Sequence, residues 1–372
     1  MKHAIPVLVL AFACVAMWFV PPAAKLADDS GESMRARVVS TDDSNIRLAG
    51  SVEYGTQHLI VEMLEGPKSG EHFRAENELR AQLDIDKKFS VGDIATVVWP
   101  GDGEWQTLHA RDHYRLGWAS ALFAAFVIML VVFGGWTGAK ALLSFVFSCF
   151  AVWKLMIPLC LQGWSASWVG FTTVSVLTAV IMYLVAGATR KGIAAFSGAM
   201  LGVAVSLVLA RFFTWVMHVN GATMPFVQSL VNSGYDGLDI ADLFVASIIL
   251  ASSGAVMDLA MDIASATEEI SRHNPGLGRA AILCSGLRVG RSVVGTMTTT
   301  LLLAYSGGYL TLLMMFASQG TPPLDFINST LVSAELVKTL VGSFGLVLVA
   351  PFTAVMSAFV FGGRATRLAQ PT

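Results

Sequence analysis

Charged residues are scarce in this 372-residue chain. Only 13% of its residues are Asp, Glu, Lys or Arg, against roughly 25% in a soluble domain, whereas 55% are hydrophobic. A chain of this composition cannot keep most of its surface in water, so we expect the lipid bilayer to be its main partner. The net charge of −2 gives no excess of basic residues, so no nucleic-acid partner is expected.

Cysteines and nucleotide-binding motifs are also scarce. None of the four cysteines, Cys14, Cys149, Cys160 and Cys284, falls in the polar segment 30–115, which argues against a disulfide framework or a zinc site. The glycines between 276 and 290 lack the Gly-Lys-Ser/Thr ending of a phosphate loop, and no histidine lies inside an expected span. We therefore expect no metal, no cofactor and no enzymatic activity.

The N-terminal segment, 1–22, contains an apolar run from Ile5 to Val20 that ends at Pro21-Pro22. The run is short for a membrane span and long for a signal core, so it predicts an N-terminal anchor helix or a signal-like span. Ala23-Ala24 offers only a weak cleavage site, which favours an uncleaved anchor. Both alternatives export the segment that follows.

Residues 33–107 predict a small extracytoplasmic β-rich domain. Alternating apolar and polar residues, as in 35–39, 58–62 and 93–98, are separated by Gly, Asp, Asn and Pro turns. A barrel of the SH3 or OB kind suits this length because closure removes the sheet edges. The sequence does not set the order of the strands.

The segment 116–361 predicts a multipass transmembrane domain, followed by a cytoplasmic tail at 362–372. Its apolar runs are long enough to cross a hydrocarbon core of roughly 30 Å as helices. With the N-terminal anchor they make about eight spans. The fold class is predominantly α: a polytopic transmembrane helix bundle with a small extracytoplasmic β domain. The expected spans are 116–134, 140–161, 168–188, 193–217, 240–264, 290–316 and 338–361.

Basic residues orient the predicted bundle. They fall on alternate connections, whereas the connections 162–167, 218–239 and 318–337 contain no Lys or Arg. By the positive-inside rule, both termini lie in the cytoplasm of a bacterial inner or plasma membrane, and the β domain lies outside. The basic residues on the cytoplasmic side are Lys2, Lys140, Arg190, Lys191, Arg272, Arg279, Arg288, Arg291, Arg364 and Arg367.

An acidic face of the span 240–264 and its continuation carries the most informative residues. A carboxylate deep in a bilayer costs several kcal/mol unless it is paired, protonated or hydrated, so such groups mark ion paths or cavities. The alternative is a purely architectural ion pair with Arg288 or Arg291, the candidate counter-charges. Three- and four-residue spacing places five residues on this face: Gly254, Asp258, Asp262, Ser265 and Glu269. Asp258, Asp262 and Glu269 are the ion- or proton-binding candidates.

A second group of polar residues is predicted to line a cavity. The alternative to cavity lining for the hydroxyl-rich span 290–316 is helix packing, because small and hydroxyl residues let helices approach closely. The alternative for Glu335 and Lys338, which lie three residues apart, is a local ion pair between them. Lys154 is too central to reach the interface easily and needs a carboxylate or water. The candidates are Lys154, Thr296, Thr299, Thr300, Tyr305, Glu335 and Lys338.

Three stretches of the chain, Gly254–Ser265, Gly290–Gly308 and Leu340–Ala354, resemble the YibE/F-like family of bacterial multipass membrane proteins. The resemblance extends from about the second span to the end of the chain. It implies a membrane protein whose biochemical role is unassigned. Asp262 stands where the family pattern has a small hydroxyl residue, so Asp258 is the better family-wide candidate.

Two functional hypotheses follow. The first is a transporter or permease for an unknown small solute or ion, in which Asp258 binds a proton or cation opposite the Thr-rich span. The alternative is a membrane scaffold or envelope-associated component, in which the exported β domain binds an envelope protein and the helices anchor it.

Overall fold

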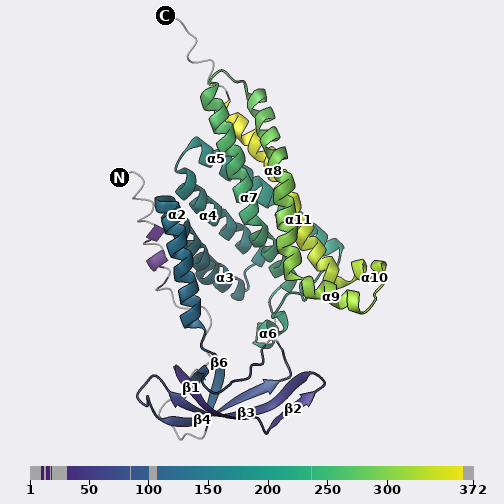
Figure 1. The fold of residues 1–372 in the computed structure, drawn as a ribbon. Helices are drawn as coiled ribbons and strands as arrows, with labels where there is room; N and C mark the ends of the chain where they lie inside the picture. The colour runs from purple at the N-terminus through teal and green to yellow at the C-terminus, as the bar shows by residue number, and fades with distance from the viewer. Residues whose placement is uncertain are drawn as a thin grey trace, which may run out of the picture. The chain divides into compact units, whose positions relative to one another are not determined.

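The computed structural model of the chain describes residues 10–11, 14–16, 18, 32–83, 85–99, 107–235 and 237–362. It divides into two compact units, a β unit at Ala24–Val132 and a helical unit made of Met1–Ala23 and Phe133–Thr372 (Figure 1). Each unit has its own hydrophobic core. Most of the expected N-terminal anchor and all but Gly362 of the expected tail lie outside the described residues.

The β unit is a closed barrel. The sheet order is β1-β5-β6-β4-β3-β2, and an additional pairing between β1 and β3 closes it. β4 and β6 run parallel, whereas the other paired strands run antiparallel. This is the strand order of an OB-type Greek-key barrel with β2 added at one edge. The strands are β1 (Glu32–Asp42), β2 (Ile46–Ala49), β3 (Val52–Met63), β4 (His72–Arg80), β5 (Ile94–Trp99) and β6 (Leu108–His113).

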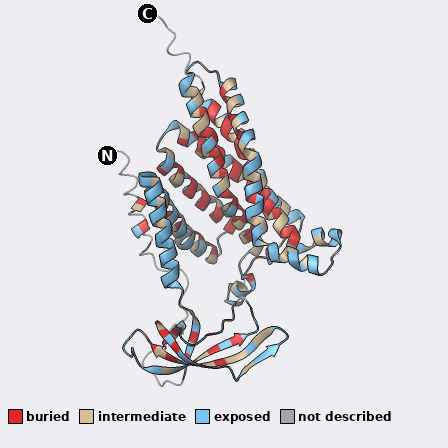
Figure 2. Cartoon of the chain, in the orientation of Figure 1, coloured by how far each residue is buried: buried red, intermediate tan, exposed pale blue. Residues whose placement is uncertain are grey.

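Alternating side chains fill the barrel, as the sequence pattern predicts. On β3, Leu59, Val61 and Met63 are at most 2% exposed, while the residues between them are more exposed. Figure 2 shows buried and more exposed positions alternating along the strands of the barrel. Ala36 on β1 and Val97 on β5 are completely buried opposite them. The predicted small β barrel is therefore present.

The described part of the chain from Leu116 onward is mainly helical. Its helices are α2 (Leu116–Ala151), α3 (Ile157–Leu161), α4 (Ala166–Ala186), α5 (Arg190–Val216), α6 (Val227–Asn232), α7 (Ile240–His273), α8 (Arg279–Gly308), α9 (Leu310–Ser318), α10 (Pro323–Asn328) and α11 (Thr330–Phe361), with a π-helical turn η1 (Val152–Met156) between α2 and α3.

The predicted count of about eight spans is not confirmed. Within the described residues, five helical runs are long and apolar enough to cross a membrane, and α8 with α9 makes a sixth if that bent pair is one span. The expected spans 116–134 and 140–161 lie in one run, Leu116–Leu161, interrupted at Gly135, where φ is 52° and ψ is −129°. The expected span 290–316 instead bends by 63° after Gly308.

Helix α7 lies at the centre of the helical unit and packs against α4, α5, α8 and α11 (Figure 1). Its buried side includes Leu259, Ile263 and Thr267, all with no exposed surface. Glycines on α8 allow the close approach: a Cβ on Gly286 would lie 3.2 Å from the Thr267 methyl group, and one on Gly290 would lie 3.4 Å from Ile263 Cδ1. These contacts place Arg291 level with Asp262.

Candidate functional site

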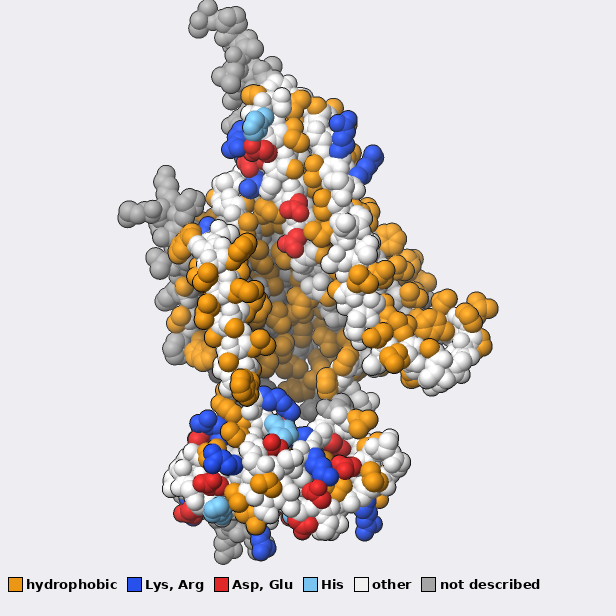
Figure 3. Space-filling view, viewed as in Figure 1, with side chains coloured by type: hydrophobic (Ala, Val, Ile, Leu, Met, Phe, Trp, Pro, Cys, Tyr) orange, Lys and Arg blue, Asp and Glu red, His pale blue; other side chains and the backbone are white. Residues whose placement is uncertain are grey.

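Three of the predicted carboxylates share one exposed face of α7. The side chains of Asp258, Asp262 and Glu269 are exposed, and Gly254 on the same face is exposed as well. The opposite face of α7 is buried. Hydrophobic side chains cover most of the visible surface of the helical unit, and a few acidic ones interrupt it (Figure 3). On this face, Asp258 and Asp262 have no ion-pair partner among the described residues.

The candidate counter-charges do not close that face. Arg288 and Arg291 are exposed on α8, and in the described part of the chain no ion pair joins either of them to Asp258 or Asp262. Glu269 instead forms an ion pair with Arg272, whose Nη2 lies 2.8 and 2.9 Å from the two carboxylate oxygens. The structure thus brings Arg291 to the level of Asp262 on a neighbouring helix without an ion pair between them.

The threonines of α8 turn their hydroxyls back onto their own helix. The Oγ1 atoms of Thr296, Thr299 and Thr300 donate hydrogen bonds of 2.9, 3.0 and 2.9 Å to carbonyl oxygens of the preceding turn. All three side chains are exposed. Tyr305 differs, because its hydroxyl is buried at the α11 interface, 3.2 Å from a Cβ built on Gly342. Among the described residues, no hydrogen bond joins these side chains to Asp258 or Asp262, and their cavity-lining role stays a prediction.

The other two cavity-lining candidates on α11 form a local pair. Lys338 Nζ donates to Glu335 Oε1 at 2.8 Å, and both side chains are half-buried. Lys154 lies in η1, the π-helical turn that precedes Pro158. A π turn of this kind widens the helix by one residue and often marks a functional position. The cavity-lining role of these three residues stays a prediction.

A buried carboxylate that the sequence analysis did not single out lies near the first turn of α7. Asp242 is only 7% exposed. Its Oδ2 accepts hydrogen bonds from Ser165 Oγ at 2.7 Å and from the Ser167 backbone N–H at 3.0 Å. Its Oδ1 lies 3.6 Å from Arg211 Nη2 on α5. Asp242 therefore ties the start of α4 and the end of α5 to α7.

The local sequence gives little indication of this cluster. Ser165 and Asp242 are 77 residues apart, and Asp242 falls in the first turn of α7, where an acidic residue is favoured simply by the helix dipole. Arg211 is the residue from which this cluster could have been predicted. An arginine inside an apolar run needs a partner, and Asp242 and Asp239 are the acids at the start of the next long helix.

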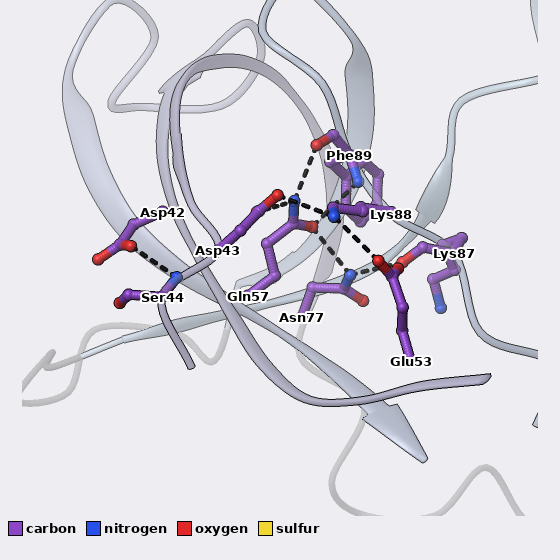
Figure 4. Close-up of polar contacts among 9 residues, drawn as sticks. All are labelled: Asp42, Asp43, Ser44, Glu53, Gln57, Asn77, Lys87, Lys88 and Phe89. Atoms are coloured by element: carbon purple, nitrogen blue, oxygen red, sulfur yellow. Dashed lines mark hydrogen bonds and ion pairs between the residues drawn. The ribbon is translucent and has the colours of Figure 1, made fainter. Parts of the chain in front are cut away.

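The β unit holds a second polar cluster. Gln57 and Asn77 are buried, and Asn77 Nδ2 donates to Gln57 Oε1 at 3.1 Å and to the Lys87 carbonyl at 2.6 Å (Figure 4). Lys88 Nζ lies 2.9 Å from Asp43 Oδ2 and 3.2 Å from Glu53 Oε1. Hydrogen bonds from Lys88 and then Gln57 lower the pKa of Asp43. This cluster fixes a connection of the barrel.

Comparison with known proteins identifies the family. The model of the YibE/F-like protein family matches residues 122–363, which is more than half of the chain. The comparisons with curated proteins and with solved structures gave no match. The matched region contains the acidic face of α7, the arginines of α8 and the Asp242 cluster. The resemblance of the three motif stretches is thereby confirmed, and the chain, a membrane protein by its apolar helices, belongs to the YibE/F-like protein family.

Proposed function

We propose that the chain is a multipass transporter or permease for a small solute or ion in the cell membrane. The observation that carries the proposal is the exposed pair Asp258 and Asp262 on α7, which has no ion-pair partner in the described part of the chain. Carboxylates facing hydrocarbon are too costly to retain, so this face must meet water, a cation or a proton. In an ion path, the carboxylates bind the passing ion and therefore have no permanent ion-pair partner.

In this mechanism Asp258 binds a proton or cation and Asp262 extends the path along the same face. Four residues of α-helix rise about 6 Å, so an ion passes from one carboxylate to the other in a single short step. Glu269, already bound to Arg272, stands at the far end of the path. No step of the mechanism breaks a covalent bond, and none requires a cofactor.

The distribution of basic residues supports an orientation for this path. Arg190 and Lys191 begin α5, Arg272 ends α7, and Arg279 begins α8. Placed by the positive-inside rule, this end of the helices is cytoplasmic, as are both termini, and the start of α7 and the barrel are extracytoplasmic. Asp258 then lies nearer the middle of the membrane than Asp262.

Proteoliposomes test the proposal. The full chain is reconstituted around a pH-sensitive dye, and proton entry is followed after an imposed pH gradient or an opposing Na⁺ gradient. We expect Asp258→Asn to abolish the protein-dependent flux and Asp262→Asn to reduce it, whereas the exposed control Asp325→Asn leaves it unchanged. If Asp258→Asn and wild type give the same flux, the coupling role is abandoned.

A second candidate function, a scaffold whose barrel binds an envelope protein, is favoured by one observation. A groove of about 770 Å³ on the barrel is lined by side chains of both charges, including Asp42, His58, Arg74 and Glu76. Mixed charge of this kind suits a polar protein surface. Deleting 33–107 separates the two functions: a lost cellular phenotype with intact flux supports the scaffold, and a retained phenotype that requires Asp258 supports transport.

A further inference from the structure

The cluster around Asp242 borders a cavity of about 590 Å³ within the helical unit. This volume lies in the range of small-molecule sites, roughly 300–1,000 Å³. Most of its wall is apolar, formed by residues such as Met156, Leu161, Trp164, Leu230, Leu238 and Leu243. Among the described residues, the charged side chains in its wall are Arg211, Asp239 and Asp242.

The hydrogen-bonding capacity of these charged groups is unequal. Asp242 already accepts from Ser165 and Ser167, and Asp239 accepts from the Asp242 backbone N–H at 2.9 Å. Arg211 has only the 3.6 Å ion pair with Asp242 among the described residues, although a guanidinium carries five N–H donors. Its side chain is 49% exposed. No hydrogen bond among the described residues uses the N–H groups of Arg211, so the guanidinium can donate to a bound anion.

Arg211 also borders a second cavity, of about 620 Å³. The wall of this cavity includes the polar side chains of Thr214, His218 and Asn220, and it shares Arg211, Asp239 and Asp242 with the first cavity. The guanidinium thus lies in the wall of two cavities whose linings are both mainly apolar. A molecule with an anionic end and an apolar body fits a cationic group in such surroundings.

We propose that this site binds an amphiphilic anion, with a phosphate or carboxylate group on Arg211 and a hydrocarbon body along the apolar wall. A guanidinium holds either group through two parallel hydrogen bonds. Asp242, whose Oδ1 lies 3.6 Å from Arg211 Nη2, positions the guanidinium in the cavity wall. The site is separate from the Asp258 face and does not depend on whether the chain transports a solute.

Fluorescence quenching measures the binding. The full chain in phosphatidylcholine nanodiscs is titrated with a nitroxide-labelled dodecyl phosphate, and the signal of Trp164 is obtained by subtracting a Trp164→Phe variant. We expect saturable quenching in wild type, at least tenfold weaker binding in Arg211→Gln and partial retention in Arg211→Lys. Arg272→Gln, which removes an exposed arginine already bound to Glu269, is the matched control and binds as wild type does.

The source of the anion is distinguished by competition. Displacement of the probe by inorganic phosphate supports a soluble anion, whereas displacement only by phosphatidylglycerol in the nanodisc supports a lipid head group. A dodecyl trimethylammonium analogue should bind at least tenfold more weakly. The proposal is overturned if the cationic analogue binds as tightly as dodecyl phosphate does. It is also overturned if Arg211→Gln binds dodecyl phosphate as wild type does.

A second variant keeps the test decisive if Arg211→Gln does not fold. Leu238→Trp fills the apolar cavity and leaves the guanidinium in place. Binding of dodecyl phosphate should weaken by a similar factor, because the hydrocarbon body loses its space. Undiminished binding in a folded Leu238→Trp protein contradicts the proposed site.

Discussion

Gln57 and Phe89 are joined by two hydrogen bonds that run in opposite directions. The buried Gln57 amide donates from Nε2 to the Phe89 carbonyl at 2.9 Å and accepts the Phe89 backbone N–H on Oε1 at 3.0 Å. The side chain thus satisfies both backbone groups of Phe89, as a neighbouring strand would (Figure 4). It holds the connection before β5 against β3, and the Phe89 ring is 2% exposed in the core.

Gln57→Leu should destabilise the barrel by about 2–4 kcal/mol, because it leaves the Phe89 N–H and carbonyl buried without partners. Hydrogen exchange of the full chain measures this: the Phe89 amide and its neighbours should lose protection. Gln82→Leu, at an exposed position, is the control. Equal protection at Phe89 in wild type and Gln57→Leu contradicts the assigned role.

The stability of the barrel should fall in acid. Lys88 and Gln57 hold the pKa of Asp43 below its ordinary value, so the ionised form stabilises the fold above the unfolded pKa of roughly 3.9. This contribution is lost as the pH falls through the lower folded pKa, since the protonated form gains nothing from Lys88. Exchange protection of β3 measured from pH 6 to pH 3 tests it.

Asp43→Asn is the matched variant for this pH dependence. It should flatten the acid-induced loss of protection and lower protection slightly at pH 6. Asp43 is 43% exposed and water screens the pair, so the effect is small, well under 1 kcal/mol, and weaker in high salt. If the exchange protection of β3 falls with pH in the same way in wild type and Asp43→Asn, the acid effect comes from other carboxylates.

Asp242→Ala should destabilise the helical unit by about 3–5 kcal/mol. The change leaves the Ser165 hydroxyl and Ser167 N–H without their acceptor and removes the counter-charge of Arg211. Asp242→Asn retains an acceptor oxygen and should cost less. The melting temperature in detergent should fall in the order wild type, Asp242→Asn, Asp242→Ala. The exposed control Asp325→Asn should melt at the same temperature as wild type. An Ala variant as stable as wild type would show that the cluster does not join α4 to α7.

Features encoded in short stretches of sequence were predictable. The inward alternation of β3 and the apolar runs that became α4, α5 and α7 depend on neighbours within one element. The strand order of the barrel and the Ser165–Asp242 hydrogen bond depend on residues far apart along the chain, so no local sequence periodicity predicts them.

The ends of the spans were less predictable for a different reason. A single backbone conformation at Gly135 decides whether an apolar stretch is read as one helical run or two. Glycines at 307 and 308 likewise precede the bend between α8 and α9. Apolar residues continue on both sides of these positions, so composition alone does not place the breaks.

Gly290 provides the sharpest test of the packing that carries the acidic face. A Cβ at this position would lie 2.8 Å from the Ala350 Cβ on α11, closer than such atoms approach, so Gly290→Ala must push α8 away from α11. Gly295, five residues along the same helix, has nothing within 4 Å. Gly295→Ala should therefore be neutral or stabilise the helix by up to about 1 kcal/mol, the difference in helix propensity. Gly290→Ala gains the same propensity and loses more in overpacking, roughly 1–3 kcal/mol. Its melting temperature in detergent should fall below those of both wild type and Gly295→Ala. Equal melting temperatures of the two alanine variants would mean that α8 does not approach α11 closely at Gly290.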